Sequence, residues 1–247
     1  MSITERLQAV RATLPEGVQL VAISKYHPVE AIREAYNAGQ RLFGENHVLE
    51  MAAKADALPD DIEWHFTGHV QTNKIKHMAP FVHTIQGVDS FHALSEINRH
   101  ALRCGRVINC LLQLHVAQEE TKYGLRPNEL FHLLSTEPWR ELRGVSITGL
   151  MAMATNTDDE TLIRSEFHTA GEVFRQVKRE FFADTPTFNT LSEGMTADYP
   201  LAVSEGSTMV RIGSAIFGER EYRLLVQLGM HERCMSVCRT LTGRGSV

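Results

Sequence analysis

The stretch Val18-Gln19-Leu20-Val21-Ala22-Ile23-Ser24-Lys25 decides the fold, because it is a short apolar run that ends in a lysine. Tyr26-His27-Pro28 interrupts the run, and a helical pattern then continues from Pro28 to Gly39. Proline suits the first turn of a helix and glycine suits its end. We therefore predict a strand over 20–25 and a helix over 28–39, the first half of a βαβ unit.

The same alternation of β-rich runs and helical patterns continues along the chain, after an amino terminus that resembles the start of a helix. We expect strands at 41–45, 63–67, 82–86, 108–116, 144–151, 188–191 and 209–212, separated by helices at 49–58, 72–78, 90–104, 127–135, 158–182 and 198–205. About eight such units close a barrel. No linker rich in Pro, Gly or Ser divides the chain. The pattern predicts an α/β fold, a (β/α)8 TIM-type barrel that occupies residues 1–247 as a single domain.

Composition excludes several classes of protein. The net charge of -5, with 43% hydrophobic and 22% charged residues, argues against disorder and against a basic nucleic-acid surface. The amino terminus lacks the basic and then apolar layout of a signal peptide, and no apolar run approaches the roughly 18 residues that span a bilayer. Four cysteines are too few for a disulfide framework. We predict a reduced, cytoplasmic protein that binds neither nucleic acid nor membrane.

A second stretch, Val210-Arg211-Ile212-Gly213-Ser214-Ala215-Ile216-Phe217-Gly218, has the composition of a strand that opens into an anion-binding turn. In barrels of this type, phosphates bind at the loops after strands seven and eight. Glycine lets the backbone approach an anion, and serine hydroxyls and peptide N–H groups donate to it. Lys25 alone would be an exposed charge at a strand end. Beside a phosphate cradle, its amine suits a Schiff base with an aldehyde cofactor.

Six groups of residues together resemble the pyridoxal phosphate homeostasis protein family. They occur in the family's order and cover roughly residues 18 to 220. They are Val21–Lys25, Phe43–Asn46, Trp64–Gly68 with Gln71–Lys74, Gly149–Met153, Leu191–Met195 and Val210–Gly218. The resemblance implies a barrel like the amino-terminal domain of alanine racemase, with pyridoxal 5'-phosphate (PLP) held as an aldimine on Lys25.

The resemblance also implies the other contacts of the cofactor. Ser192, Gly213 and Ser214 would hold the phosphate, and Arg211 would lie near the pyridine nitrogen. Asn46 and Met151 would line the ring. Glu193 departs from the family, which usually has an uncharged residue there, and an acidic side chain beside a phosphate is unfavourable unless it points away. The segments 67–70 and 120–124 are also variants of the family's usual strings.

These residues favour a carrier of the cofactor over an enzyme. A guanidinium stays charged and cannot accept a proton, so Arg211 weakens the ring as an electron sink, although racemases that resemble this barrel use a similar arginine. After Gly218 only 29 residues remain (247 minus 218), too few for the β domain that supplies the opposing base in racemases. We expect a monomer that buffers PLP or delivers it to PLP-dependent apo-enzymes. The alternatives are a PLP-dependent amino-acid racemase or related enzyme, and a regulatory interaction protein that senses PLP.

Histidines and cysteines do not point to a metal site. His65 and His69 are four residues apart, but His65 falls in a predicted strand and His69 in the following loop, so they would not share a helix face. Cys234 and Cys238 are expected to be reduced thiols on a terminal helix, because a metal would need further ligands. We therefore predict no metal ion.

Overall fold

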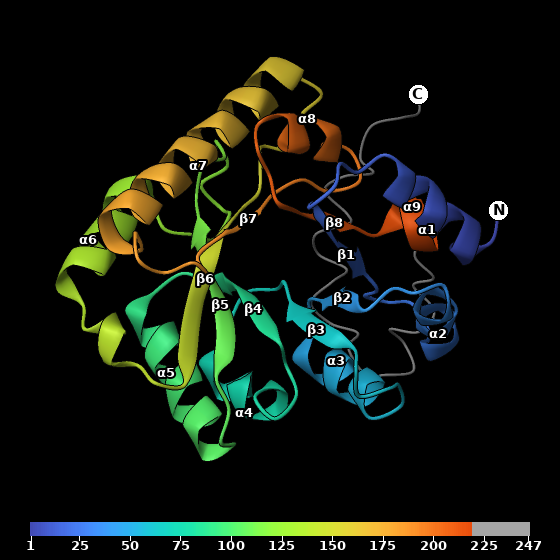
Figure 1. The fold of residues 1–247 in the computed structure, drawn as a ribbon, viewed down its shortest axis with the longest axis horizontal. Coiled ribbons are helices and arrows are strands. Elements are labelled where there is room, and N and C mark those ends of the chain that lie inside the picture. Colours follow the sequence, from blue (N-terminus) through green and yellow to red (C-terminus); the bar gives the residue numbers. More distant parts are fainter. Residues whose placement is uncertain (219–247) are drawn as a thin grey trace, which may run out of the picture.

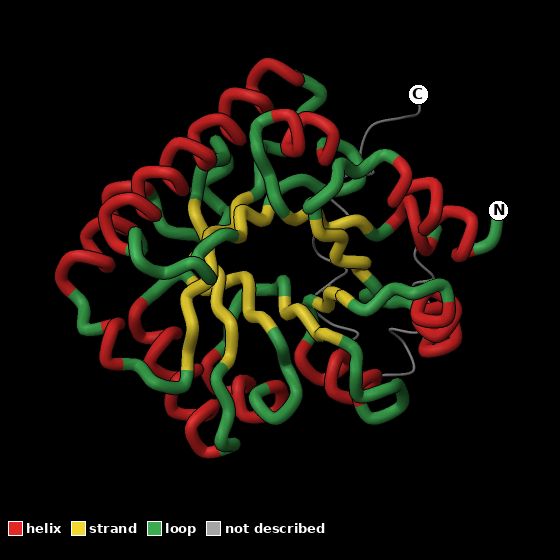
Figure 2. The backbone as a smooth tube through the Cα atoms, viewed as in Figure 1, coloured by secondary structure: helices red, strands yellow, loops and turns green. Residues whose placement is uncertain are grey.

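Eight parallel strands close into a barrel in the computed structural model, which describes residues 1–218 (Figure 1). Each strand pairs with the next one along the chain, and β8 pairs with β1 to complete the ring. The closing pair is in register from Gln19 opposite Met209 to Ala22 opposite Ile212. In the tube view the strands form an inner ring that helices surround (Figure 2). The prediction of a (β/α)8 barrel is confirmed.

The strands are short, as expected for a barrel of this type. They are β1 Gln19–Ile23, β2 Leu42–Glu45, β3 Glu63–Phe66, β4 Thr84–Val88, β5 Ile108–Leu114, β6 Val145–Ala152, β7 Thr190–Ser192 and β8 Met209–Ile212.

The first helix precedes β1, and further helices follow the strands and cover the outside of the barrel (Figure 1). They are α1 Ile3–Ala12, α2 Val29–Asn37, α3 Val48–Ala55, α4 Ile75–Met78, α5 Phe91–Arg103, α6 Pro127–Thr136, α7 Glu160–Phe181, α8 Tyr199–Ser204 and α9 Ser214–Phe217, with short 3-10 turns at Thr72–Lys74 and Trp139–Glu141. In α1, Ser2 and Glu5 form a capping box that satisfies the first N–H groups.

Two strands begin two residues later than the sequence predicts. Val82 donates its N–H to Met78 O, so it still belongs to the turn that ends α4, and β4 starts at Thr84. Phe188 likewise closes a turn onto Thr185 O, and β7 starts at Thr190. Apolar side chains at both positions pack into the core, which explains why hydrophobicity alone assigns them to strands.

The core lies between the barrel and its helices, whereas part of the barrel interior is polar. Phe43 and Trp64 pack against each other with ring centroids 6.1 Å apart, on the outer face of neighbouring strands β2 and β3. Inside the barrel, by contrast, Gln86, Ser192 and Arg211 are buried and joined by hydrogen bonds. Polar side chains joined by hydrogen bonds therefore run through the interior from one end of the barrel to the other.

The expectations about the domain and the cysteines extend beyond the residues that the structure describes. The single domain over 1–247 stays a prediction, and Cys234 and Cys238 lie outside the described residues. Cys104 is an exposed free thiol and Cys110 is a buried one. Among residues 1–218, no helix combines the length and apolar character required to cross a membrane.

Candidate functional site

The residues predicted to contact a cofactor all come from the carboxyl ends of strands. Parallel strands bring these ends to one rim of a barrel, so the residues share that rim. In chain order they are Lys25 two residues after β1, Asn46 directly after β2, Met151 in β6, Ser192 at the end of β7, Arg211 in β8, and Gly213 and Ser214 directly after β8. The rim therefore gathers residues that are almost two hundred positions apart in sequence.

Lys25 and the segment after β8 belong to neighbouring strands. Ala22 pairs with Ile212, so both chains leave the barrel at the same level. A Cβ added to Gly213 would lie 3.1 Å from Ile23 O and 3.3 Å from Ile23 Cβ. A side chain at position 213 would push the two strand ends apart. Glycine there lets the turn before Ser214 pack directly against the end of β1.

The turn that carries Lys25 is held by side chains of α3. Tyr26 has φ of 67°, a left-handed conformation that costs energy for a residue with a side chain. Its backbone N–H donates to Glu50 Oε1 at 2.6 Å. Lys54 Nζ donates to Ser24 O at 2.8 Å, on the other side of Lys25. These two bonds fix the peptides before and after Lys25.

Lys54 also forms two buried ion pairs behind this turn. Its Nζ lies 2.8 Å from Glu45 Oε1 and 2.7 Å from Glu50 Oε1, and none of the three side chains is more than 6% exposed. Burial raises the pKa of Glu45 to about 7, although Lys54 acts in the opposite direction. Ser24 Oγ donates a further hydrogen bond to Glu45. The only sign of this cluster in the sequence is the i,i+4 spacing of Glu50 and Lys54, which does not by itself predict a buried pair.

The rim beside Lys25 is positively charged. Tyr26 Oη and His47 Nε2 are 2.7 Å apart, which joins the Lys25 turn to the start of α3. Burial lowers the pKa of His47, and the nearby charges of Lys25 and Lys74 lower it further against the opposing effect of Glu50. Lys25 and Lys74 thus lie close enough to His47 for their charges to act on it. Such a region favours an anionic ligand.

Asn46 and Met151 are fixed on opposite sides of the barrel. Thr67 Oγ1 donates to Asn46 Oδ1 at 2.8 Å, and a Cβ at Gly68 would lie 2.4 Å from Asn46 O. The string Thr67–Gly68 thus packs against the end of β2. Met151 is buried and pairs with Ser192 in the β6–β7 ladder.

Arg211 is the centre of the polar network inside the barrel. Nη1 donates to both Ser192 O and Ser192 Oγ at 2.8 Å, and Nη2 donates to Ala152 O at 2.9 Å. Burial lowers the pKa of Arg211 to about 10, and Glu193 acts to raise it. The guanidinium is therefore charged at neutral pH. These bonds use three of its five N–H groups, so two remain for other acceptors.

Glu193 lies away from the barrel interior. Ser192 faces inward, and successive side chains of an extended chain alternate, so Glu193 points toward α8. It is fully buried, and neither carboxylate oxygen has a hydrogen-bond partner among residues 1–218. Burial raises the pKa of Glu193 well above its usual value, while Arg211 acts to lower it. Burial therefore favours the neutral form of the carboxyl group, and the departure from the family's pattern places no side chain inside the barrel.

His65 and His69 do not meet, as their spacing in a strand and a loop predicted. His65 is in β3 and faces the barrel interior, where Gln86 Nε2 lies 2.9 Å from its Nδ1. His69 stacks on Tyr123 with ring centroids 3.8 Å apart, and its Nδ1 lies 3.5 Å from Asp89 Oδ2.

Comparisons with known proteins agree with this arrangement. The family model described as "Alanine racemase, N-terminal domain" matches residues 1–221. The chain is 37% identical over 224 residues to the pyridoxal phosphate homeostasis protein of Aquifex aeolicus (strain VF5), a match that covers 89% of this chain and 96% of that protein. The chain belongs to the pyridoxal phosphate homeostasis protein family.

Two further proteins are similar to this chain over most of their length. The pyridoxal phosphate homeostasis protein of Vibrio alginolyticus is 38% identical over 213 residues, which cover 84% of this chain and 89% of that one. The solved structure of PipY from Synechococcus elongatus PCC7942 with PLP bound superposes with a TM-score of 0.79 at 37% identity, covering 88% of this chain and all of PipY.

Proposed function

We propose that this family member binds PLP covalently on Lys25 and buffers the cofactor or delivers it within the cell. The observation that carries the proposal is that the end of β1, which leads to Lys25, packs against Gly213 at the end of the neighbouring strand β8. It is supported by the family's name and by PipY, whose structure has PLP bound. Lys25 would hold the cofactor through its Nζ amine, and PLP would supply the aldehyde for a Schiff base, whose formation releases water.

The residues of the rim fit the chemistry of this cofactor. A phosphate needs hydrogen-bond donors and a close backbone, which Ser214 and the side-chain-free Gly213 provide. Ser192 Oγ donates to Gln86 in the structure and would join them once that bond is released. The lysines near His47 add positive charge. Asn46 and Met151 would contact the ring from opposite sides of the barrel.

Arg211 supports a carrier rather than a catalyst. Its guanidinium is charged at neutral pH, and two of its N–H groups could donate hydrogen bonds to a ring nitrogen. A guanidinium does not transfer its proton to that nitrogen, however. A pyridine ring held by such a donor would stay unprotonated and would be a weaker electron sink, which favours storage of PLP although racemases of this barrel type use a similar arginine.

The test is the visible absorbance of the purified protein. We expect a yellow protein whose absorption band is lost in Lys25→Ala and kept in Lys76→Ala, which removes an exposed lysine of α4. Borohydride should fix the cofactor to the chain, and peptide mapping should then find it on Lys25. A colourless protein that takes up no added PLP, or a label on another lysine, would contradict the proposal.

A PLP-dependent racemase is the second candidate, because the matching family model is that of the alanine racemase N-terminal domain. An enzyme of this kind exchanges the α-proton of its amino acid with solvent. We expect no exchange above a PLP-only control when a panel of amino acids is incubated with the holo-protein in deuterium oxide. Proton exchange that requires Lys25 and proceeds at an ordinary enzymatic rate would show that the protein is an enzyme and would contradict the carrier proposal.

The carrier proposal includes a monomeric, cytoplasmic protein in which residues 1–247 form one domain. It also includes transfer of PLP to PLP-dependent apo-enzymes. Light scattering during gel filtration measures the mass against 27.8 kDa for one chain. Transfer is measured by mixing the holo-protein with an apo-enzyme and recording the recovery of its activity, with Lys25→Ala as the control.

A further inference from the structure

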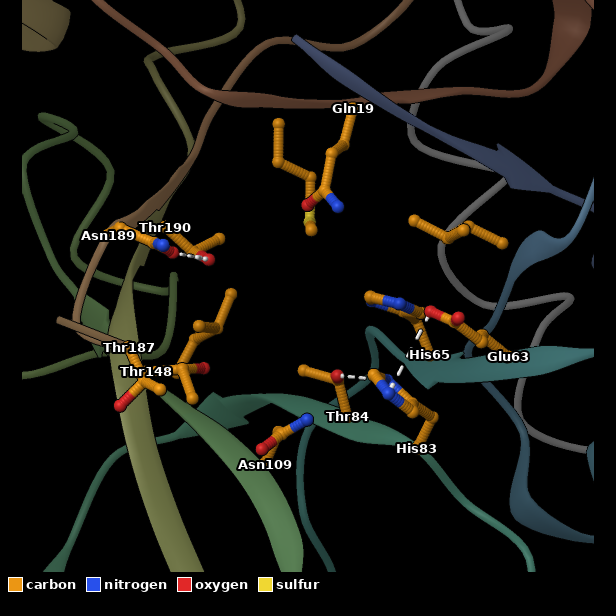
Figure 3. A pocket seen from close by; sticks show the side chains of 13 residues that line it. Gln19, Glu63, His65, His83, Thr84, Asn109, Thr148, Thr187, Asn189 and Thr190 are labelled. Carbon is orange, nitrogen blue, oxygen red and sulfur yellow. Dashed lines mark hydrogen bonds and ion pairs between the residues drawn. The ribbon is translucent and has the colours of Figure 1, made fainter. Parts of the chain in front are cut away.

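A polar pocket of about 260 Å³ opens at the end of the barrel opposite to Lys25 (Figure 3). It is lined by the first residues of several strands, among them Gln19 of β1, Glu63 of β3, Thr84 of β4 and Met209 of β8. Side chains from these strands point toward one space. The pocket is thus separate from the rim where the cofactor is proposed to bind.

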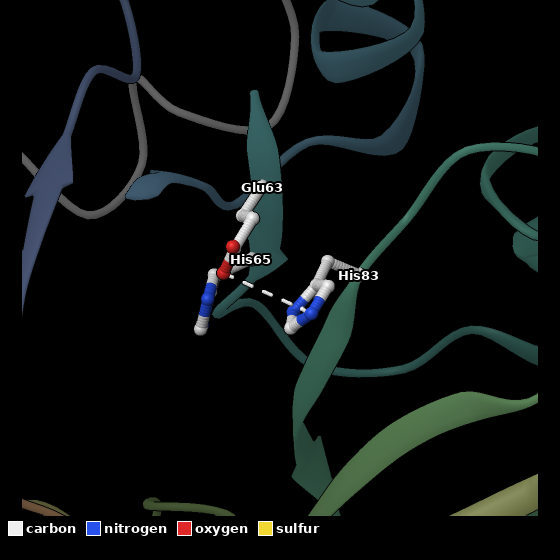
Figure 4. A group of neighbouring side chains, drawn as sticks. All are labelled: Glu63, His65 and His83. Atoms are coloured by element: carbon white, nitrogen blue, oxygen red, sulfur yellow. Dashed lines mark ion pairs between the residues drawn. The ribbon is translucent and has the colours of Figure 1, made fainter. Parts of the chain in front are cut away.

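Three side chains at one side of this pocket carry groups that bind transition metals. Glu63, His65 and His83 each offer one ligand atom, and these atoms all lie within 4.8 Å of one another (Figure 4). Glu63 and His65 are two residues apart on β3 and so face the same side. His83 precedes Thr84, which pairs with His65 across the β3–β4 ladder.

His65 has a buried nitrogen that no other group uses. The residue is 2% exposed, and its Nε2 has no hydrogen-bond partner among residues 1–218. Its Nδ1, by contrast, lies 2.9 Å from the Gln86 amide. A buried polar atom without a partner is costly, and a ligand is one way to satisfy it.

His83 has a similar arrangement. Its Nδ1 lies 2.9 Å from Thr84 Oγ1, and its Nε2 lies 3.8 Å from Glu63 Oε2. That distance is too long for a hydrogen bond but close to the spacing of about 3.4 Å between two ligands of a tetrahedral zinc ion. Glu63 and His83 are 45% and 42% exposed, so both can move the remaining distance. In metal sites, a hydrogen bond at the other ring nitrogen orients the ligating imidazole.

We propose that Glu63, His65 and His83 bind one divalent transition-metal ion of the zinc type at the amino-terminal end of the barrel. The two Nε2 atoms and one Glu63 oxygen are the ligands, which leaves a position for water. Two imidazoles and one carboxylate suit zinc and cobalt better than the oxygen-binding ions calcium and magnesium.

Binding at His65 Nε2 requires a change at Gln86. Nε2 must lose its hydrogen, which moves to Nδ1, and Nδ1–H then needs an acceptor. In the structure, the amide nitrogen of Gln86 faces Nδ1. A half-turn of the amide brings Oε1 to that position. Gln86 is therefore a positioning residue for the metal and is not a ligand.

The test uses Co²⁺, whose visible spectrum reports the geometry and type of its ligands. We expect full-length protein, purified with its cofactor and carrying Cys234→Ser and Cys238→Ser, to show one saturable cobalt band that Zn²⁺ abolishes. His83→Ala should remove the band. Glu63→Gln should weaken binding at least tenfold. His132→Ala, which removes an exposed histidine of α6, is the matched control and should leave the titration unchanged.

Several outcomes would overturn the proposal. They are the absence of a saturable cobalt band, a band in His83→Ala that is unchanged from the wild type, an affinity of Glu63→Gln for Co²⁺ equal to that of the wild type, and a loss of the band in His132→Ala as complete as in His83→Ala. His83 and Glu63 are partly exposed, so their variants are expected to fold, and circular dichroism of each variant verifies this. Gln86→Leu adds a readout of positioning: the band should remain with an affinity reduced about 10- to 100-fold.

Discussion

Glu193 is a residue whose cost to stability depends on pH. In the folded protein, burial raises the pKa of its carboxyl group well above the ordinary value of 4.5, near which it ionises in the unfolded chain. Below that pH both states hold the proton, and the group does not make the free energy of unfolding depend on pH. As the pH rises above 4.5, the unfolded state releases its proton first, and the wild type loses stability by up to about 1.4 kcal/mol per pH unit until the folded pKa is reached.

We therefore expect Glu193→Gln to be increasingly more stable than the wild type as the pH rises from 4.5 to 8. Urea unfolding at several pH values measures the difference between the two proteins. Glu45 also has a raised pKa, of about 7, but it is present in both proteins and cancels in the comparison. Two stability curves that run parallel across this range would show that Glu193 is ionised in the folded state.

Helix α3 stabilises the turn of Lys25 through Lys54. Lys54→Met leaves Glu45 and Glu50 buried without their cation, a change that costs about 3–5 kcal/mol in comparable buried pairs. It also removes the hydrogen bond to Ser24 O. We expect reduced stability in urea and, at a concentration where the variant is folded, weaker PLP uptake.

The control for this variant is Lys76→Met, which replaces an exposed lysine of α4 and should change stability by no more than about 0.5 kcal/mol. A second comparison is Lys54→Met combined with Glu45→Gln and Glu50→Gln, which removes the unpaired charges and should recover part of the lost stability. If Lys54→Met is as stable as Lys76→Met, the buried ion pairs have no role in holding the turn.

Gly149 determines how closely β6 and β7 approach. A Cβ at this position would lie 1.8 Å from Thr190 O and 2.6 Å from Thr190 C, and both are backbone atoms. Gly149→Ala therefore requires the strands to separate. We expect a loss of about 3 kcal/mol or more in the free energy of unfolding. Gly171→Ala in α7 is the control, because its nearest contact is an ordinary 3.4 Å and alanine favours a helix by up to about 1 kcal/mol.

The strand bounds show how much of the fold the sequence could predict. The alternation of strands and helices predicted the barrel, and strand β8 was predicted with its observed bounds. Strands β4 and β7 were displaced, because Val82 and Phe188 are apolar but hydrogen-bond within turns. The rim positions of Lys25 and Gly213 followed from strand ends. Contacts between segments distant in sequence, such as Lys54 with Ser24 or Gln86 with His65, have no periodic signal and required the structure.

At the scale of the whole molecule, a chain of hydrogen bonds connects the two ends of the barrel. Arg211 Nη1 donates to Ser192 Oγ, which donates to Gln86 Oε1, and Gln86 Nε2 donates to His65 Nδ1. A metal ion on His65 turns the Gln86 amide, so the Ser192 hydroxyl faces an N–H group and loses its acceptor. It can then donate to an anion at the rim, such as the phosphate proposed there. The metal and PLP thus favour the same orientation of Gln86.

We therefore expect the two ligands to bind cooperatively. Saturating Zn²⁺ should tighten PLP binding by about 5- to 150-fold, and PLP should tighten Co²⁺ binding by the same factor, because coupling between sites is reciprocal. Titrations of each ligand with and without the other measure both factors. His83→Ala abolishes the effect if the ion acts from the amino-terminal end, whereas direct chelation of Zn²⁺ by PLP would persist in that variant. Gln86→Leu interrupts the chain and should reduce both factors to one; full coupling in that variant would show that Gln86 does not transmit it.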